Sequence, residues 1–147
     1  SKRILAELQN DGRISNVELA TRVNLSPAAC LERVRKLQES NYILGYTAQL
    51  NSHLLDVALL VFIEVVLDRT TPDVFDAFKR GVQAIPEVLE CHMVAGGFDY
   101  LVKARVKDMN AYRDFLGKSL LQLSGVRETH TYAVMEEVKN TTALPIK

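Results

Sequence analysis

Tryptophan is absent from this 147-residue sequence, and cysteine and histidine are scarce. The two cysteines, Cys30 and Cys91, lie far apart and form no CxxC motif. We therefore expect buried free thiols in a reducing cytoplasm. The three histidines, His53, His92 and His130, are not spaced as metal ligands. Neither a metal nor a cofactor is expected.

Long hydrophobic runs are also missing. The longest run ends at Ile63, just before Glu64, and is far too short to cross a bilayer. The 48% apolar and 24% charged residues are typical of a globular chain and exclude a disordered one. The sequence begins at Ser1 with neither Met nor a signal peptide, so we expect a further N-terminal segment to precede it.

A catalytic constellation cannot be assembled from this sequence. An enzyme would need a nucleophile, base and orienting group, or paired carboxylates in a cleft. Ser26 is better used as a helix cap, because Pro27 follows it at the first helical position. We expect no enzymatic activity.

The charge that is present is slightly uneven. Residues 1–50 carry seven basic and five acidic side chains, and the remainder carries eleven and thirteen. This weak asymmetry allows a nucleic-acid-facing N-terminal part without proving one.

The N-terminal third has the pattern of three short helices. The first ends at Asp11-Gly12, the second runs from Ser15-Asn16 to Asn24, and the third begins at Ser26. The expected inward-facing residues are Ile4, Leu5 and Leu8, then Val17, Ala20 and Val23, then Cys30, Leu31, Val34 and Leu37. Residues 42–50 look extended, and residues 51–57 are a predicted linker.

From residue 58 onward a strand–helix–strand pattern occurs twice. The expected elements are a strand at 58–68, a helix at 72–84 and a strand at 88–95, then a strand at 98–106, a helix at 109–123 and a strand at 126–138. Oxygens of Thr71 and Asp108 are expected to cap the two helices. A shift of 38 residues places Val88-Leu89-Glu90-Cys91-His92 on Val126-Arg127-Glu128-Thr129-His130. The doubling predicts a ferredoxin-like βαββαβ sheet with both helices on one face.

Alternation along the strands separates the two faces of this sheet. One face has the apolar rows Val61, Ile63, Val65, Leu67 and Tyr100, Val102, Ala104, Val106, which we expect to lie under the helices. The other face mixes apolar and charged groups: Phe62, Glu64, Val66, Leu101, Lys103 and Arg105. This mixture favours a dimer joined sheet to sheet, with Glu64 pairing Lys103 or Arg105. A partly solvated sheet is the alternative.

Two helices joined by a tight turn, the second with a polar cap, have the layout of a helix-turn-helix. On the third helix, Ala28, Ala29, Glu32 and Lys36 lie opposite the apolar stripe, with Arg33 and Arg35 beside them. Small residues in the first turn would allow close approach to base edges, and basic groups could reach phosphates. A solvated face with routine charges explains the same residues equally well.

Several segments together resemble the Lrp/AsnC (feast/famine) transcription regulators. They are DGRISNVELATRVNLSPAACLERVRKLQ, GYTAQLN, LLVFIEV, GGFDYLVKARVKDM and TYAVMEEVK, and they span almost the whole chain in the family's order. The resemblance implies an α+β protein with a winged helix-turn-helix domain at 1–50 and a βαββαβ effector-binding and oligomerisation domain at 58–147. It also implies dimers that assemble into octamers or higher forms and wrap DNA.

For DNA, the residues expected to take part are Arg13, Asn16, Arg22, Ser26, Ala28, Ala29, Glu32, Arg33, Arg35 and Lys36. Dimers would place two third helices in successive major grooves.

For the effector, the resemblance implies an amino-acid site between neighbouring dimers, lined by the loop Ala95, Gly96, Gly97, Phe98, Asp99 and Tyr100. Asp99 would accept from the α-ammonium; alternatively, it closes its own turn through a backbone bond. Side chains implied to affect the response are Met93, Met109, Leu121, Tyr132, Ala133 and Val134. Gly97 and Ala133 depart from the acidic and bulkier residues usual in the family.

We expect a sequence-specific DNA-binding regulator that responds to leucine or another apolar amino acid. The main alternative is an amino-acid-sensing module that acts through protein contacts without DNA.

Overall fold

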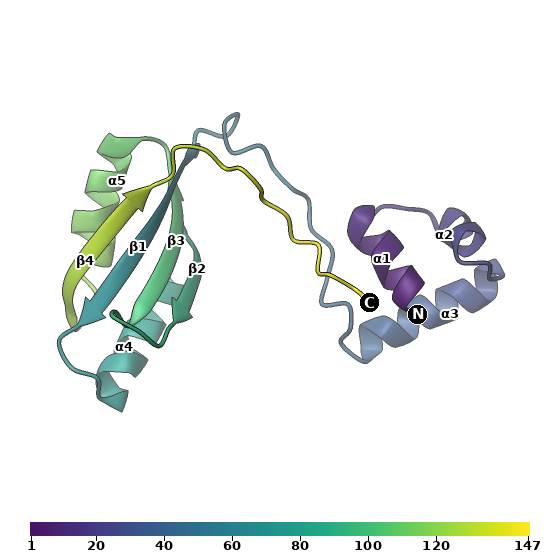
Figure 1. Ribbon diagram of the computed structural model, residues 1–147, viewed down its shortest axis with the longest axis horizontal. Coiled ribbons are helices and arrows are strands. Elements are labelled where there is room, and N and C mark those ends of the chain that lie inside the picture. Colours follow the sequence, from purple (N-terminus) through teal and green to yellow (C-terminus); the bar gives the residue numbers. More distant parts are fainter. The chain divides into compact units, whose positions relative to one another are not determined.

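The computed structural model describes all 147 residues and divides into two compact units (Figure 1). The helical unit comprises Ser1–Gln49 together with Val138–Lys147. The sheet unit comprises Leu50–Glu137.

Three helices build the helical unit: α1 (Lys2–Asn10), α2 (Asn16–Arg22) and α3 (Pro27–Glu39). Ser15 Oγ accepts from the backbone N–H of Glu18 at 3.1 Å, and Ser26 Oγ from that of Ala29 at 3.2 Å. These caps confirm the predicted helix starts, because each satisfies a donor that the first turn leaves free. The core consists of Ile4, Leu19, Ala20, Cys30 and Leu37.

Two of the expected inward-facing residues lie outside this core. Val17 is 65% exposed and Leu31 is 61% exposed, so both predictions were wrong. On α2 the inward positions are Leu19 and Ala20. On α3 the apolar stripe follows Cys30, Val34 and Leu37, spaced four and three residues apart, and Leu31 falls outside it. Residues 43–51 form neither helix nor strand.

The C-terminal residues return to α1 instead of extending the sheet unit. The side-chain amide of Gln9 donates to the carbonyl of Leu144 at 2.8 Å and accepts from the N–H of Leu144 at 2.9 Å. Lys2 Nζ also donates to the carbonyl of Lys147. The boundary at 58–147 drawn from the sequence therefore differs from the structural division, which assigns Val138–Lys147 to the helical unit.

The sheet unit is a four-stranded antiparallel sheet in the order β2-β3-β1-β4, with both helices on one face (Figure 1). Its elements are β1 (Leu59–Leu67), α4 (Pro72–Gln83), β2 (Val88–Met93), β3 (Tyr100–Val106), α5 (Met109–Phe115), the π-helical turn η1 (Leu116–Leu120) and β4 (Val126–Ala133). This arrangement confirms the predicted ferredoxin-like order. No helix in the protein has both the length and the apolar character needed to cross a membrane.

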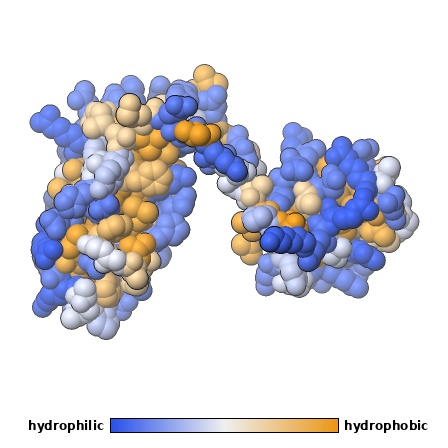
Figure 2. All heavy atoms as spheres, viewed as in Figure 1, coloured by the Kyte–Doolittle hydropathy of each residue, from blue (hydrophilic) through white to orange (hydrophobic).

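The core of the sheet unit lies between the sheet and its helices. Both predicted apolar rows are buried there, against residues such as Phe78 and Leu120. Phe78 stacks on Tyr100 with ring centroids 4.5 Å apart. Asp108 caps α5 through Ala111, as expected, but Thr71 makes no capping bond to α4. The open face of the sheet shows apolar surface among polar groups (Figure 2).

Candidate functional site

The turn between α2 and α3 is held by short polar contacts. Asn16 Nδ2 donates to the carbonyl of Pro27 at 2.8 Å and so ties the start of α2 to the start of α3. Asn24 adopts a left-handed conformation with φ 58°, which lets the chain reverse. Asn16 and Ser26, both expected near DNA, therefore use these polar atoms to set the geometry of the helix-turn-helix.

The outer face of α3 is exposed, as the helix pattern predicts. Ala28, Glu32, Arg33, Arg35 and Lys36 are exposed, and Ala29 is half-buried. Leu31, which the sequence interpretation had placed in the core, belongs to this outer face. An apolar side chain there can contact a thymine methyl group in the major groove. The spacing of Cys30, Val34 and Leu37 was the signal that could have identified it.

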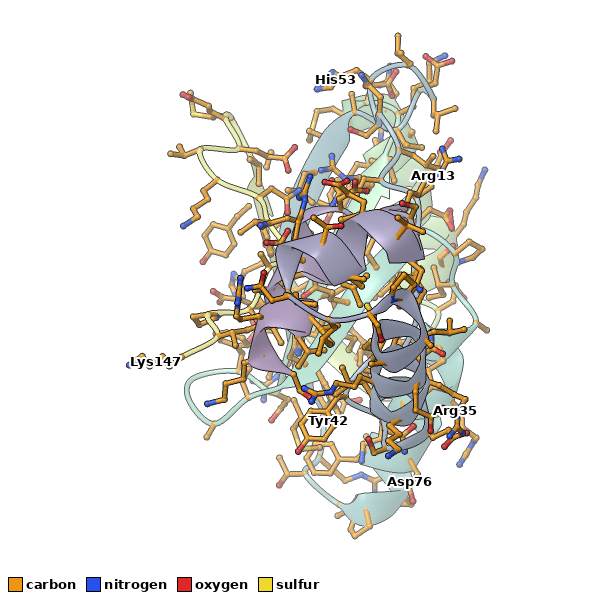
Figure 3. The ribbon with its side chains drawn as sticks, turned by 90° about the vertical axis from the view of Figure 1, so that its right-hand side faces the viewer. Arg13, Arg35, Tyr42, His53, Asp76 and Lys147 are labelled. Carbon is orange, nitrogen blue, oxygen red and sulfur yellow. The ribbon has the colours of Figure 1, made fainter.

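The five basic residues expected at DNA fall into two classes. Arg22 pairs with Glu7 at 3.0 Å and Glu18 at 3.2 Å. Arg35, which projects outward from α3 (Figure 3), pairs with Glu32 and Glu39. The hydrogen bonds with Arg35 lower the pKa of the Glu32 carboxyl below its ordinary value. Arg13, Arg33 and Lys36 form no salt bridge, so their charges are free for another partner.

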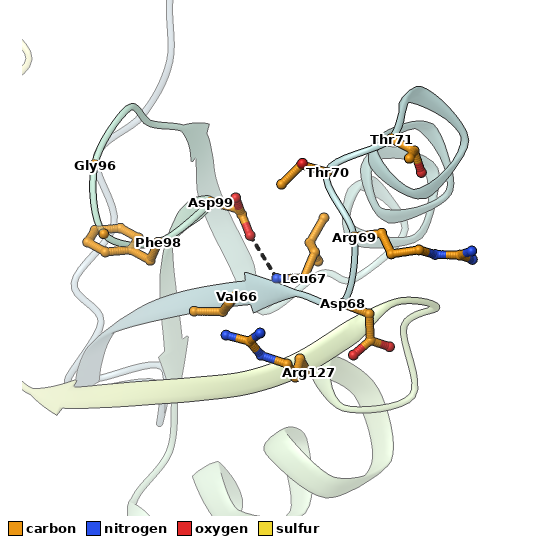
Figure 4. A pocket seen from close by; sticks show the side chains of 11 residues that line it. Val66, Leu67, Asp68, Arg69, Thr70, Thr71, Gly96, Phe98, Asp99 and Arg127 are labelled. Carbon is orange, nitrogen blue, oxygen red and sulfur yellow. Dashed lines mark hydrogen bonds between the residues drawn. The ribbon is translucent and has the colours of Figure 1, made fainter.

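In the sheet unit, the loop between β2 and β3 is anchored to β1. The N–H of Asp99 donates to the carbonyl of Val65 at 2.9 Å, and Asp99 Oδ2 accepts from the N–H of Leu67 at 2.8 Å (Figure 4). The carboxylate therefore bridges to a neighbouring strand and does not close its own turn. Asp99 Oδ1 has no hydrogen-bond partner within the chain. Gly96, with φ 157°, adopts a conformation that L side chains rarely reach.

A cavity of about 520 Å³ opens beside this loop. Four chain segments line it: the end of β1, the link to α4, the β2–β3 loop and the start of β4. The lining residues are Val66, Leu67, Asp68, Arg69, Thr70, Thr71, Gly96, Gly97, Phe98, Asp99 and Arg127. Its volume lies within the range of about 300–1,000 Å³ usual for small-molecule sites.

Of the expected effector residues, the cavity includes Gly96, Gly97, Phe98 and Asp99. Ala95 and Met93 are exposed close to them in the chain. Tyr100, by contrast, is only 2% exposed and packs into the core, with no partner for its hydroxyl. Burial raises the pKa of the Tyr100 phenol. Its side chain is therefore held away from the cavity.

The remaining expected effector residues, Met109, Leu121, Tyr132, Ala133 and Val134, lie outside the cavity. Val134 donates to the carbonyl of Leu60 at 2.9 Å, whereas Asp99 bonds to Val65. Five residues of extended strand separate those two anchors, which corresponds to about 16 Å. Tyr132 hydrogen-bonds Glu64, which raises the pKa of the Tyr132 phenol. Within one chain, the cavity beside the loop therefore does not include the end of β4.

The open face of the sheet carries the six residues expected at a dimer interface. Phe62, Glu64, Val66, Leu101, Lys103 and Arg105 are all half-buried. Lys103 pairs with Glu90 at 3.1 Å, and Arg105 makes a two-pronged contact with Glu137 at 2.8 and 2.9 Å. Within one chain, the expected pairing of Glu64 with either cation is absent, because β2 and the segment after β4 supply closer carboxylates.

Comparison with known proteins assigns different families to the helical unit and the sheet unit. Residues 1–43 match the winged helix-turn-helix DNA-binding family, and residues 60–144 match the Lrp/AsnC ligand binding domain. The leucine-responsive regulatory proteins of Escherichia coli K12 and Salmonella typhimurium are each 60% identical over 146 residues, covering 99% of this chain and 89% of theirs.

A solved structure is similar throughout the fold. It is a transcriptional regulator from Neisseria meningitidis in complex with L-methionine, with a TM-score of 0.94 and 39% identity, covering 98% of this chain and 93% of that one. Members of the group are transcription regulators and not enzymes. This chain belongs to the Lrp/AsnC family of DNA-binding, amino-acid-responsive transcription regulators.

Proposed function

We propose that this protein binds specific DNA sites as a cytoplasmic oligomer and that an apolar amino acid, leucine first among them, controls its assembly. The observation that carries the effector role is the Asp99 carboxylate, held by the Leu67 N–H at the edge of a cavity of about 520 Å³. One oxygen is used for positioning, and the other remains available to accept from an α-ammonium group.

A complete effector site needs a second copy of the chain. Asp99 bonds to Val65 of β1 and Val134 to Leu60, five residues apart, and neither Tyr132 nor Val134 lines the cavity beside the loop. A neighbouring dimer would bring these two residues to the loop, so that one chain holds the head group and another the apolar side chain. Ligand binding would then favour one assembly over another, with a coupling of about 1–3 kcal/mol.

Calorimetric titration of the twenty amino acids into the wild-type protein and Asp99→Asn tests the effector role. Asparagine preserves the acceptor for Leu67 but removes the charge, so we expect saturable leucine binding that is lost in the variant. Asp68→Asn, in the same cavity, is the control and should bind as the wild type does. Equal binding by wild type and Asp99→Asn would contradict the assignment.

For DNA, we assign the main phosphate contacts to Arg13, Arg33 and Lys36, since Arg22 and Arg35 each pair with two carboxylates, whose negative charge repels a phosphate. Lys36→Ala should reduce the slope of log affinity against log salt by about one unit and weaken all sequences alike. Arg35→Ala, on the same helix, is the matched control and should change the slope less. Changes at Ala28, Ala29 or Leu31 should alter sequence preference instead.

For assembly, we assign the open face of the sheet to a two-fold dimer that builds octamers or larger forms. Phe62 is the large apolar residue at the middle of that face, paired with Lys103 on one side and Tyr132 on the other. Phe62→Glu should give monomers in sedimentation experiments, whereas Lys79→Glu on the exposed side of α4 should not. A Phe62→Glu protein that keeps the wild-type mass would exclude this interface.

A further inference from the structure

The cavity beside the β2–β3 loop is lined by two arginines to which the sequence analysis assigned no role. Arg127 at the start of β4 and Arg69 before α4 both line it. In Figure 4 the Arg127 guanidinium turns toward Val66, whereas that of Arg69 points away from Asp99. Of the two arginines, Arg127 is therefore the one whose guanidinium lies beside Val66, a residue that lines the same cavity as the loop.

Arg127 is not committed to a strong partner within the chain. Its guanidinium lies 3.3 Å from the Glu128 carboxylate, with the two side chains 57% and 49% exposed. A pair this exposed contributes at most about 1 kcal/mol, because water screens it and holding two long side chains in one geometry costs entropy. A ligand carboxylate could therefore take the place of Glu128 at little cost.

The repeat within the sheet unit does not require a cation at this position. A shift of 38 residues places Arg127 on Leu89, whose side chain is exposed on β2. Strand β2 thus has an exposed apolar residue at the position equivalent to Arg127 of β4. Packing alone gives no reason for a guanidinium at the start of β4.

An α-amino acid carries its ammonium and its carboxylate on one carbon atom. Asp99 Oδ1 offers an acceptor without a partner, and Arg127 offers a planar donor that matches a carboxylate through two parallel hydrogen bonds. Val66 and Phe98 add apolar wall to the same cavity. Acceptor, donor and apolar surface therefore line one cavity.

We propose that Arg127 binds the α-carboxylate of the effector while Asp99 binds its α-ammonium, so that the cavity selects free α-amino acids over their amides. The assignment rests on the proposed effector function and names the residue that recognises the second charge of the ligand. Arg127 acts here as a specificity-determining residue.

The test compares each amino acid with its carboxamide, which keeps the ammonium and the side chain but lacks the negative charge. Calorimetry on the wild-type oligomer and Arg127→Gln would use leucine with leucinamide and methionine with methioninamide. Arg127→Gln should weaken the amino acid about tenfold to a hundredfold, the range for a hydrogen bond between charged groups. Binding of the amide should change by less than about twofold.

Two further variants act as controls. Arg127→Lys keeps the charge without the fork and should recover part of the affinity, and Arg69→Gln should bind both ligands as the wild type does. Circular dichroism and sedimentation would establish that each variant folds and assembles.

The outcomes separate the two hypotheses. If Arg127→Gln binds the amino acid normally, or weakens amino acid and amide equally, Arg127 does not recognise the carboxylate, although the effector function stands. If the wild-type oligomer binds neither leucine nor methionine, the proposed function falls together with this assignment.

Discussion

The two units of the chain carry hydrophobic cores of very different size. Five buried residues form the core of the helical unit, whereas fourteen form that of the sheet unit. The helical unit adds individual polar contacts: the Ser15 and Ser26 caps and the Asn16 bond to Pro27. Each such contact contributes about 1 kcal/mol. The part of the protein assigned to DNA thus depends on single hydrogen bonds, and the sheet unit on collective burial.

The largest effect should come from the larger core. Phe78 is fully buried and stacks on Tyr100, so Phe78→Ala should lower the free energy of unfolding of the sheet unit by about 4 kcal/mol. Chemical denaturation measures the loss. In hydrogen-exchange experiments on the variant, the amides of the helical unit should stay as protected as in the wild type. Half-buried Phe75 is the matched control, and Phe75→Ala should cost less. Simultaneous loss of protection in both units would mean that they do not fold independently.

In the helical unit, each buried residue forms a larger fraction of the core, because the core is small. Ile4→Ala removes a fully buried side chain from a five-residue core and should cost about 3 kcal/mol. We expect α1 to α3 to lose hydrogen-exchange protection and DNA binding to weaken, while the unfolding of the sheet unit stays unchanged. If the variant is destabilised as expected but keeps its DNA affinity, the helical unit remains folded without the Ile4 side chain.

The helix caps sharpen the comparison between the units. Ser26→Ala should destabilise the helical unit by about 1 kcal/mol, because the Ala29 N–H loses its partner. Thr71→Ala removes a hydroxyl that makes no capping bond to α4 and contacts only the exposed carboxylate of Asp73, so it should change the free energy of unfolding by no more than about 0.5 kcal/mol. Urea denaturation of both variants gives the difference directly. Equal decreases in the free energy of unfolding would mean that the Ser26 capping bond does not stabilise α3 more than Thr71 stabilises α4.

The smallest expected effect is a pH dependence on the open face of the sheet. Hydrogen bonds from His92 and Lys103 lower the pKa of Glu90 below its ordinary value of 4.5. A lowered carboxyl pKa stabilises the fold above about pH 4.5, and the contribution disappears as the pH falls through the folded-state pKa. The difference in urea midpoint between wild type and Glu90→Gln should therefore be greatest near neutral pH, though small, and should shrink as the pH falls below about 4.5. A difference that grows in acid would exclude this origin.

Most of the sheet unit could be predicted from the sequence because its signals are local. Alternation placed Val61, Ile63 and Val65 in one buried row, and repetition indicated the order of the elements. The same alternation put Tyr100 under the helices, which conflicts with its placement among the effector residues; the structure agrees with the alternation. Leu31 was misplaced because an apolar residue beside a helix stripe looks like part of it.

The cavity was harder to predict than the loop that borders it. A sequence motif identifies Asp99, but Arg127 reaches the same cavity from a strand that begins 27 residues later. Nothing in the local pattern of β4 marks that position, since the neighbouring segments of the cavity come from β1 and the link to α4. Long-range placement of this kind depends on the register of the sheet.

The pairing of Gln9 with Leu144 has a consequence for biosynthesis. The two residues are separated by 135 positions, so α1 leaves the ribosome long before its partner is made. At about 5–20 residues per second, the interval is on the order of ten seconds. During that time the amide of Gln9 is solvated, and the whole sheet unit has time to fold. The contact between Gln9 and Leu144 can therefore form only after all of Leu50–Glu137 has been synthesised, so the helical unit must hold α1 in place by its apolar core until then.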